Sequence, residues 1–270
     1  MRGVPVLVAV VLVALAPGAR ALPIVDGVLK PEPSPPNQPK PEPEPAPPPK
    51  PHKGKKASTK RLSNERTLSR WAYVVRATVA RRNPSRHSKR IKKLRSSTPD
   101  GTPELVLALS ERRGRDGRLW VRVRLPMRPN GRKGWVRRGR LGAFRAVRTR
   151  LWIDRKRFVA KLYRRGRVIW RAPVGVGRPG WPTPSGRFYV RERLIPVERG
   201  SIYGAFAFGT SAYSPVLTDW PGGGMVGVHG TNEPGLIPGR ISHGCVRVRN
   251  GPISRLRKLM PLGTPIRIVG

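Results

Sequence analysis

The chain has 270 residues, with 56 Lys or Arg against 14 Asp or Glu, which gives a net charge of +42 at pH 7. Such a charge attracts polyanions. The single cysteine, Cys245, excludes an internal disulfide and leaves an intermolecular bridge, a reactive thiol or a small buried side chain.

The first 21 residues have the pattern of a secretory signal peptide. Arg2 gives a positive start, residues 4–16 form an apolar run, and Ala19-Arg20-Ala21 fits a cleavage site after Ala21. As a helix this run rises only about 20 Å, short of a hydrocarbon core about 30 Å thick, so an uncleaved anchor is the weaker alternative. The protein is therefore expected outside the cytoplasm, with no nucleic acid partner and with the membrane touched only through this segment.

Residues 22–67 are predicted to be a proline-rich and basic linker. Residues 30–52 hold twelve prolines, and residues 53–67 are basic without hydrophobic periodicity. Prolines at this density favour an extended polyproline II conformation of about 3.1 Å per residue, reaching roughly 70 Å. The composition fits a spacer after the leader, or a disordered tail.

Residues 68–147 are predicted to form a small basic β-barrel. The stretch L-W-V-R-V-R-L, residues 119–125, alternates strictly, Pro129-Asn130-Gly131 marks a turn, and Gly134-Trp135-Val136 a short strand. The W-V-x-V and G-W-V patterns resemble bacterial SH3-like domains, which implies a wall-binding or targeting module. Residues 53–150 carry 31 Lys or Arg against 5 Asp or Glu, so anionic cell-wall polymers are expected partners.

Residues 148–270 are predicted to form a second, mostly β domain that is large enough to bury its own core. Residues 158–162 and 168–174 alternate on either side of Arg165-Gly166, which predicts a β-hairpin. One short helix is expected near the C-terminus, with Gly251 as its cap and Pro252 at its first position. The predicted core aromatics are Trp170, Phe188 and Phe208, and those predicted at the edge of a cleft are Trp181, Tyr203 and Trp220.

The surroundings of Cys245 favour a reactive thiol. His229 ends the alternating stretch 225–228, and Cys245 opens another short strand, so the two strand ends are expected side by side. An imidazole there would take the thiol proton and lower the thiol pKa towards neutral. Gly244 would turn its amide towards an oxyanion hole. Arg247 alternates to the face of Cys245, where it could hold a substrate carboxylate.

These residues resemble the signature of a known family. The sequence His229-Gly230-Thr231, followed by Ser242-His243-Gly244-Cys245-Val246-Arg247, is similar to the active-site pattern of L,D-transpeptidase catalytic domains, also called YkuD domains. The segment W-P-T-P-S-G-R-F, residues 181–188, resembles the family's upstream motif, and residues 263–268 its closing strand. The resemblance covers roughly residues 148–269 and implies a β-sandwich or barrel-like catalytic fold.

The resemblance implies peptidoglycan chemistry that needs no metal or cofactor. Cys245 would attack the carbonyl before the terminal D-alanine of a tetrapeptide stem and form a thioester. An amine of a second stem would resolve it into a 3→3 cross-link, whereas water would make the protein an L,D-carboxypeptidase. His229 would be base and then acid, oriented by the Gly230 carbonyl. The remaining candidate substrate-site residues are Ser242, His243, Thr231 and Tyr203.

Two other uses of these residues stay open. Cys245, His243 and His229 are soft ligands that could hold a zinc ion, although their spacing is unlike that of usual zinc pairs. The chain could also be a non-enzymatic protein that binds cell-wall polyanions, with binding that weakens steeply as salt rises. Thiol reactivity separates an enzyme from such a binding module.

Overall fold

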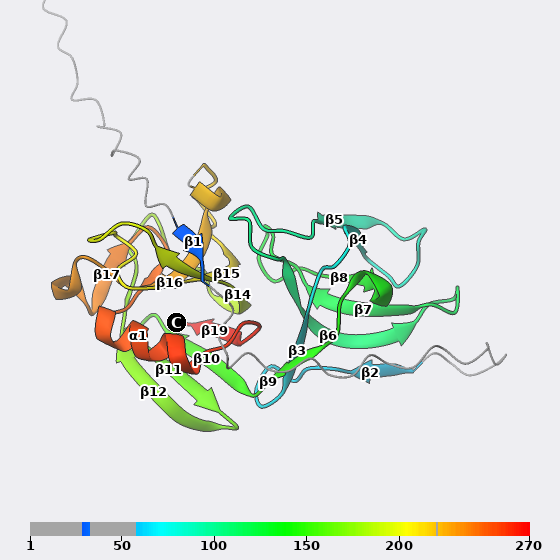
Figure 1. Cartoon of the computed structure of the whole chain (residues 1–270), viewed down its shortest axis with the longest axis horizontal. Helices are drawn as coiled ribbons and strands as arrows, with labels where there is room; N and C mark the ends of the chain where they lie inside the picture. Colours follow the sequence, from blue (N-terminus) through cyan, green and yellow to red (C-terminus); the bar gives the residue numbers. More distant parts are fainter. Residues whose placement is uncertain (1–28, 33–57, 220) are drawn as a thin grey trace, which may run out of the picture.

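The computed structural model describes residues 29–32, 58–219 and 221–270. The predicted signal peptide, residues 33–57 of the predicted linker and Trp220 lie outside the described residues. Two β units lie side by side (Figure 1), and the mostly β fold with one α-helix among the described residues is as predicted. That helix is too short to cross a bilayer, and no other described helix is long or apolar enough to do so.

The first unit is an eight-stranded sheet in the order β5-β4-β8-β7-β6-β3-β9, with β2 paired to β6. Its strands are β2 (Thr59–Arg61), β3 (Ser69–Tyr73), β4 (Thr78–Arg81), β5 (Arg90–Leu94), β6 (Leu105–Arg113), β7 (Leu119–Arg124), β8 (Lys133–Arg137) and β9 (Arg145–Val147). A short 3-10 turn, η1 (Arg138–Arg140), follows β8. The unit has its own apolar core, and its likeness to SH3 domains stays a prediction.

Strand β7 departs from strict alternation for an electrostatic reason. Arg124 should face solvent, yet it is buried, because its guanidinium forms an ion pair with Glu65 at 2.7 Å. Arg122 on the same strand is exposed, as alternation predicts. A charged residue can therefore be buried on the outward face of a strand when a partner neutralises it.

The second unit is an eleven-stranded sheet in the order β12-β11-β10-β19-β14-β15-β16-β18-β13-β17, with β1 paired to β14. Its strands are β1 (Leu29–Pro31), β10 (Thr149–Asp154), β11 (Val159–Arg164), β12 (Arg167–Pro173), β13 (Gly175–Gly177), β14 (Gly186–Pro196), β15 (Ala207–Tyr213), β16 (Met225–His229), β17 (Gly239–Ser242), β18 (Val246–Arg247) and β19 (Pro265–Val269). Short 3-10 turns are η2 (Pro221–Gly223) and η3 (Pro234–Leu236).

The predicted hairpin is present as β11 and β12, and the helix as α1 (Asn250–Leu259). The helix begins two residues earlier than predicted, so Pro252 lies inside its first turn, where a missing N–H costs nothing. The helix buries Ile253 and Leu256. Trp170 is buried and donates its indole N–H to the carbonyl of Pro252 at 3.1 Å, which fixes the helix against the hairpin.

Strand β1 belongs to the segment predicted as a linker. It pairs antiparallel with β14, and the Glu32 carboxylate that follows it forms ion pairs with Arg193 (2.6 Å) and Arg257. Strand β2, also in that segment, pairs with β6 of the first unit. The proline-rich stretch therefore joins two docked strands. Only residues 22–28 separate the predicted cleavage site from the second unit.

The two units share a continuous core. Trp71, Leu105 and Leu107 of the first unit pack into the apolar core of the second. The Trp71 indole lies so close to Gly263 that a Cβ at Gly263 would be 2.0 Å from the ring. Glu104 and Arg191 form an ion pair across the boundary, with each side chain only 4% exposed. The first unit therefore supports the second one directly.

Candidate active site

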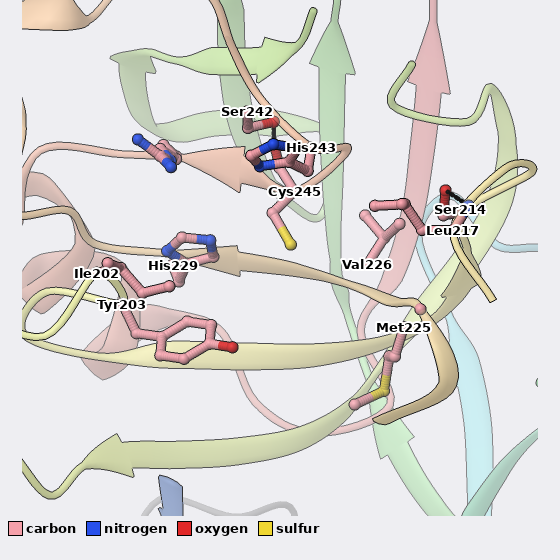
Figure 2. A pocket seen from close by; sticks show the side chains of 12 residues that line it. Ile202, Tyr203, Ser214, Leu217, Met225, Val226, His229, Ser242, His243 and Cys245 are labelled. Atoms are coloured by element: carbon pink, nitrogen blue, oxygen red, sulfur yellow. Dashed lines mark hydrogen bonds between the residues drawn. The ribbon is translucent and has the colours of Figure 1, made fainter. Parts of the chain in front are cut away.

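Cys245 and His229 lie on neighbouring parallel strands. Strand β16 pairs with β18 so that Val228 faces Val246 and His229 faces Arg247, which sets Cys245 beside Gly227. The Gly227 N–H donates to the Cys245 sulfur at 3.3 Å. A Cβ on Gly227 would lie 3.9 Å from that sulfur and 3.6 Å from the His229 ring, so this glycine borders the space between the two groups. Figure 2 shows both side chains facing that space.

The His229 ring is fixed in one tautomer. Its Nδ1 lies 2.7 Å from the Gly230 carbonyl, which can only accept, so Nδ1 carries the proton and Nε2 is free to act as a base. Tyr203 contacts the ring edge to face, with centroids 5.1 Å apart. Burial lowers the pKa of His229 to about 4, although its bond to Gly230 opposes the shift. The imidazole is therefore neutral at pH 7.

The thiol of Cys245 is also neutral in the free protein. Desolvation by the surrounding protein raises its pKa, and this outweighs the Gly227 amide and the Arg247 charge, both of which lower it. The sequence-based expectation of a thiol pKa lowered towards neutral is therefore wrong for this state. A charged imidazole would have been needed, and burial prevents it. The resting site is a neutral thiol beside a neutral base.

We predict that alkylation of Cys245 by iodoacetamide keeps accelerating as the pH rises through 9. Only the thiolate attacks, and a raised thiol pKa moves its formation to higher pH. The rate would be followed by mass spectrometry between about pH 6 and pH 10, with N-acetylcysteine alongside as an unperturbed thiol. The chain has no other cysteine, so every adduct reports on this site. A rate that levels off below pH 8 would contradict the prediction.

Two hydroxyl groups, those of Ser242 and Thr183, fix the turn that precedes Cys245. Ser242 donates its Oγ–H to the Cys245 carbonyl at 2.6 Å and accepts the Gly244 N–H at 3.1 Å. Thr183 donates to the Gly244 carbonyl at 2.8 Å and accepts the Gly177 N–H at 2.8 Å. Gly244 has φ +121°, a conformation that favours glycine. Its amide is thus already bonded to Ser242, which argues against the predicted role of the Gly244 amide as an oxyanion donor.

His243 is part of an aromatic and cationic cluster. Its ring contacts Trp181 edge to face at 4.8 Å, and its Nε2 accepts a bond from Arg178 at 2.5 Å. The Arg178 guanidinium also lies over the Trp181 ring at 4.4 Å. Burial and the charges of Arg178 and Arg247 lower the pKa of His243. His243 therefore shapes the wall of the pocket as a neutral ring.

Arg247 lies in the pocket on the face of Cys245, as alternation predicted, and it already holds a carboxylate. Its guanidinium bonds the Glu233 carboxylate at 2.5 Å. The Arg247 side chain is 13% exposed, whereas that of Glu233 is 51% exposed. A solvent-facing carboxylate on Arg247 can be exchanged for one of a ligand, because exposed ion pairs are weak.

Thr231 does not line the pocket, so its assignment to substrate binding is wrong. It is 0% exposed, and Asn250 holds it from both sides by accepting its N–H at 3.1 Å and donating to its carbonyl at 2.9 Å. The Thr231 hydroxyl accepts the Glu233 N–H at 3.0 Å. Thr231 therefore anchors the turn after His229, and Glu233 is the residue of that turn that reaches the pocket arginine.

The pocket over Cys245 is small, with an enclosed volume of about 40 Å³. Besides Cys245 and His229, its lining includes four of the predicted residues: Tyr203, Ser242, His243 and Arg247. Ser214 and Leu217, from the connection between β15 and β16, and Met225, the first residue of β16, form the opposite wall (Figure 2). Gly224 also lines the pocket. A ligand site usually encloses several hundred Å³. The enclosed space therefore suits only the reacting end of a longer substrate.

The comparisons with known proteins agree with this geometry. Residues 148–268 match the family model of the L,D-transpeptidase catalytic domain, YkuD. The match spans 121 of the 270 residues, somewhat less than half of the chain. The match begins at the connection before β10 and ends within β19, so it covers the whole second sheet apart from β1.

Two curated relatives and one solved structure are similar to part of this chain. "Putative L,D-transpeptidase YkuD" of Bacillus licheniformis is 31% identical over 108 residues, which are 40% of this chain and 58% of the relative. The protein of the same name in Bacillus subtilis is 31% identical over 102 residues, 38% of this chain and 54% of the relative. The chain thus spans little more than half of each. The catalytic domain of the E. faecium L,D-transpeptidase is 23% identical, with a TM-score of 0.34, covering 45% of this chain and 96% of that one.

The first unit supplies two residues of the candidate site that sequence reasoning missed. Arg128 donates to the carbonyls of Ser214 (2.8 Å) and Leu217, and its guanidinium lies over the Tyr213 ring at 5.1 Å. The Asn130 amide donates to the Tyr213 carbonyl at 2.7 Å and accepts the Tyr213 N–H at 3.0 Å. The opposite wall of the pocket is therefore held from outside the segment that matches the family model.

The surroundings of Cys245 show no gathering of metal ligands among the described residues. Within the part of the chain that the structure describes, no three His, Cys, Asp or Glu side chains come close enough to share an ion. His229 and His243 instead have other partners, the Gly230 carbonyl and the Arg178–Trp181 pair. The residues present do not fit the zinc alternative.

Proposed function

We propose that the protein is a peptidoglycan L,D-transpeptidase that forms 3→3 cross-links through a thioester on Cys245. One observation carries the proposal. The only thiol of the chain lies at a pocket beside a buried, neutral imidazole whose tautomer leaves Nε2 as a base. The family of the domain supplies the substrate class, the peptide stems of peptidoglycan.

Acylation starts from the neutral pair. As the Cys245 sulfur attacks the carbonyl before the terminal D-alanine, the thiol proton passes to Nε2 of His229. The C–N bond then breaks, and the leaving amine of D-alanine takes that proton from the imidazolium. A thioester and free D-alanine result. The buried ring holds its charge only briefly, and the Gly230 carbonyl stabilises the imidazolium while it exists.

The second half of the reaction decides between two activities. The side-chain amine of a second stem's diamino acid attacks the thioester and loses a proton to His229. The sulfur leaves and is reprotonated, and the new amide is the 3→3 cross-link. Attack by water instead would release a tripeptide stem, which is L,D-carboxypeptidase activity. We propose that the backbone N–H of Cys245 donates a hydrogen bond to the oxyanion in both steps, because the Gly244 N–H already donates to the Ser242 hydroxyl.

The test is a product analysis by mass spectrometry. The full chain would be incubated with a purified disaccharide-tetrapeptide. A transpeptidase gives a dimer together with one D-alanine for each cross-link, whereas a carboxypeptidase gives only disaccharide-tripeptide and D-alanine. Release of D-alanine without any dimer would exclude the cross-linking function, and no release would exclude both. Export and association with the cell wall stay part of the proposal, since they depend on the predicted leader.

We predict that Arg247 and Glu233 act in opposite directions on substrate capture. Arg247→Ala should raise KM by about 10-fold, because it removes a charge-assisted bond to a stem carboxylate. Glu233→Gln should lower KM by about 2- to 3-fold, because it frees the guanidinium from an exposed, weak ion pair. Steady-state kinetics on disaccharide-tetrapeptide would measure both. If both substitutions raised KM equally, substrate binding would need the intact ion pair between Arg247 and Glu233 and not a free guanidinium.

We also predict that Arg128→Ala raises KM by about 5- to 10-fold while kcat changes by less than about 2-fold. The substitution removes the hydrogen bonds that Arg128 donates to the carbonyls of Ser214 and Leu217, and it leaves Cys245 and His229 unchanged. The pocket wall would then position the substrate less well, which weakens its binding. Arg132→Ala is the matched control, because Arg132 lies in the same connection and is exposed. An unchanged KM for Arg128→Ala would show that the wall does not need this clamp.

A further inference from the structure

A second hollow lies away from the thiol. It is a groove of about 1410 Å³ where the β9–β10 connection, the tip of the β11–β12 hairpin and the end of α1 meet. It shares no lining residue with the pocket of Cys245. Its exposed cations are Arg148, Arg164, Arg165, Arg167 and Lys258.

Strand register brings the four arginines together. Arg164 and Arg167 are directly opposite each other on β11 and β12. The Arg165 N–H donates to the Arg148 carbonyl at 3.0 Å, so the hairpin tip is tied to the β9–β10 connection. Like charges directly opposite in a β-ladder destabilise the pair. The fold therefore bears an electrostatic cost at this place.

The described residues do not offset this cost. Nearby cations of β10 and β11 lie over aromatic rings: Arg150 over Tyr163 at 4.7 Å and Lys161 over Trp152 at 5.6 Å. None of the five exposed groove cations has such a ring, and none has a carboxylate within ion-pair distance among the described residues. The groove has unused capacity to bind negative charge.

The floor of the groove is already organised. Glu32 is its one acidic lining residue, and its carboxylate is 5% exposed and taken up by Arg193 and Arg257. Arg193 also donates to the carbonyls of Met260 (2.6 Å) and Arg257 (2.8 Å), which fixes the end of α1. A ligand would thus meet a preformed surface and lose little affinity to ordering it.

We propose that this groove binds a linear polymer of closely spaced phosphate groups. A guanidinium presents a planar fork of donors that matches phosphate oxygens, and four of the five free cations are arginines. Several clustered guanidinium groups can donate hydrogen bonds to one anion if that anion accepts several at once, as phosphate does. The proposal does not rest on the transpeptidase activity. The sequence had suggested that the first unit binds polyanions, whereas this groove lies on the second unit.

The experiment compares two triple variants of equal charge. Arg164→Gln, Arg165→Gln and Arg167→Gln change the groove together, while Arg112→Gln, Arg115→Gln and Arg118→Gln change exposed arginines of the first unit. Binding of inorganic polyphosphate would be titrated at several salt concentrations. We expect the groove variant to weaken binding by about 100-fold and to flatten the salt dependence, and the control variant to weaken it by less than about 3-fold. Equal losses would mean that net charge alone binds the polymer and would overturn the proposal.

Two further arms test the chemistry. Replacing the three groove arginines with lysines keeps the charge but removes the forks, so binding should fall part of the way, by about 10-fold. Full retention would contradict the role of the guanidinium. Polyglutamate of similar length should bind more weakly and lose affinity equally with both glutamine variants. Tighter, groove-dependent binding of polyglutamate would overturn the assignment to phosphate. Thermal unfolding midpoints would show that the exposed substitutions leave the fold intact.

Discussion

Replacing Cys245 with alanine is expected to abolish release of D-alanine from disaccharide-tetrapeptide, by on the order of 10⁴- to 10⁶-fold. The chain has no second thiol to take over the attack, and the proposed acyl-enzyme needs a sulfur at this position. The fold should survive, because the side chain makes a single hydrogen bond, from the Gly227 N–H. Product analysis by mass spectrometry would measure the loss, with the unfolding midpoint as the structural check.

His229→Ala should come close to the same loss, because a nucleophile and its base act as one unit. The double variant should therefore lose little more than either single one. Cys245→Ser provides a matched control: it keeps the shape and the polarity of the side chain but offers a much poorer nucleophile. Turnover that persists in Cys245→Ala would remove the central claim about this site.

Replacing Glu104 with alanine is expected to destabilise the whole chain by about 3–5 kcal/mol. Glu104 belongs to the first unit, yet its carboxylate accepts bonds from Nε (2.8 Å) and Nη2 (2.5 Å) of Arg191 in the second. Burial alone lowers the pKa of Arg191, but the Glu104 hydrogen bond and charge outweigh burial and raise it. Without Glu104, a guanidinium would stay buried with its charge unpaired. Urea unfolding followed by circular dichroism would measure the change.

Two further variants test whether the loss of stability in Glu104→Ala comes from the unpaired charge of Arg191. Asp116→Ala breaks an ion pair with Arg137 at 3.6 Å whose side chains are about a third exposed, so it should cost less than about 1 kcal/mol. Adding Arg191→Met to Glu104→Ala should recover much of the lost stability, because the unpaired charge is removed. A double variant no more stable than Glu104→Ala would show that packing, and not the charge, causes the loss.

The contact between the two units also explains how the pocket is completed. Trp71 packs on Gly263, and Glu104 forms an ion pair with Arg191. Arg128 donates hydrogen bonds to the backbone carbonyls of Ser214 and Leu217. The first unit is therefore a structural part of the site, whatever else it binds. Its own ligand stays a prediction, and the phosphate groove proposed above lies on the other unit.

Local patterns in the sequence were enough to predict several of the elements and to place His229 and Cys245 side by side. Alternation predicted the β11–β12 hairpin, and apolar spacing with a proline predicted α1, because both depend on which face of one element is buried. The positions of His229 and Cys245 at strand ends followed from the same patterns. Trp170, Phe188 and Phe208 are buried, as their places in alternating stretches indicated.

The sequence by itself supplied the groups on which the proposed chemistry depends: one thiol, one histidine sixteen positions away and an arginine on the face of the thiol. The tertiary structure alone decided how these groups are held and charged. Thr183 reaches Gly244 across 61 positions, Glu104 reaches Arg191 across 87 and Arg128 reaches Leu217 across 89. Burial, which moved the pKa of Cys245 up and that of His229 down, comes from the whole surrounding core. Hydrogen bonds and desolvation depend on distance in space, and no local pattern records which distant segments meet.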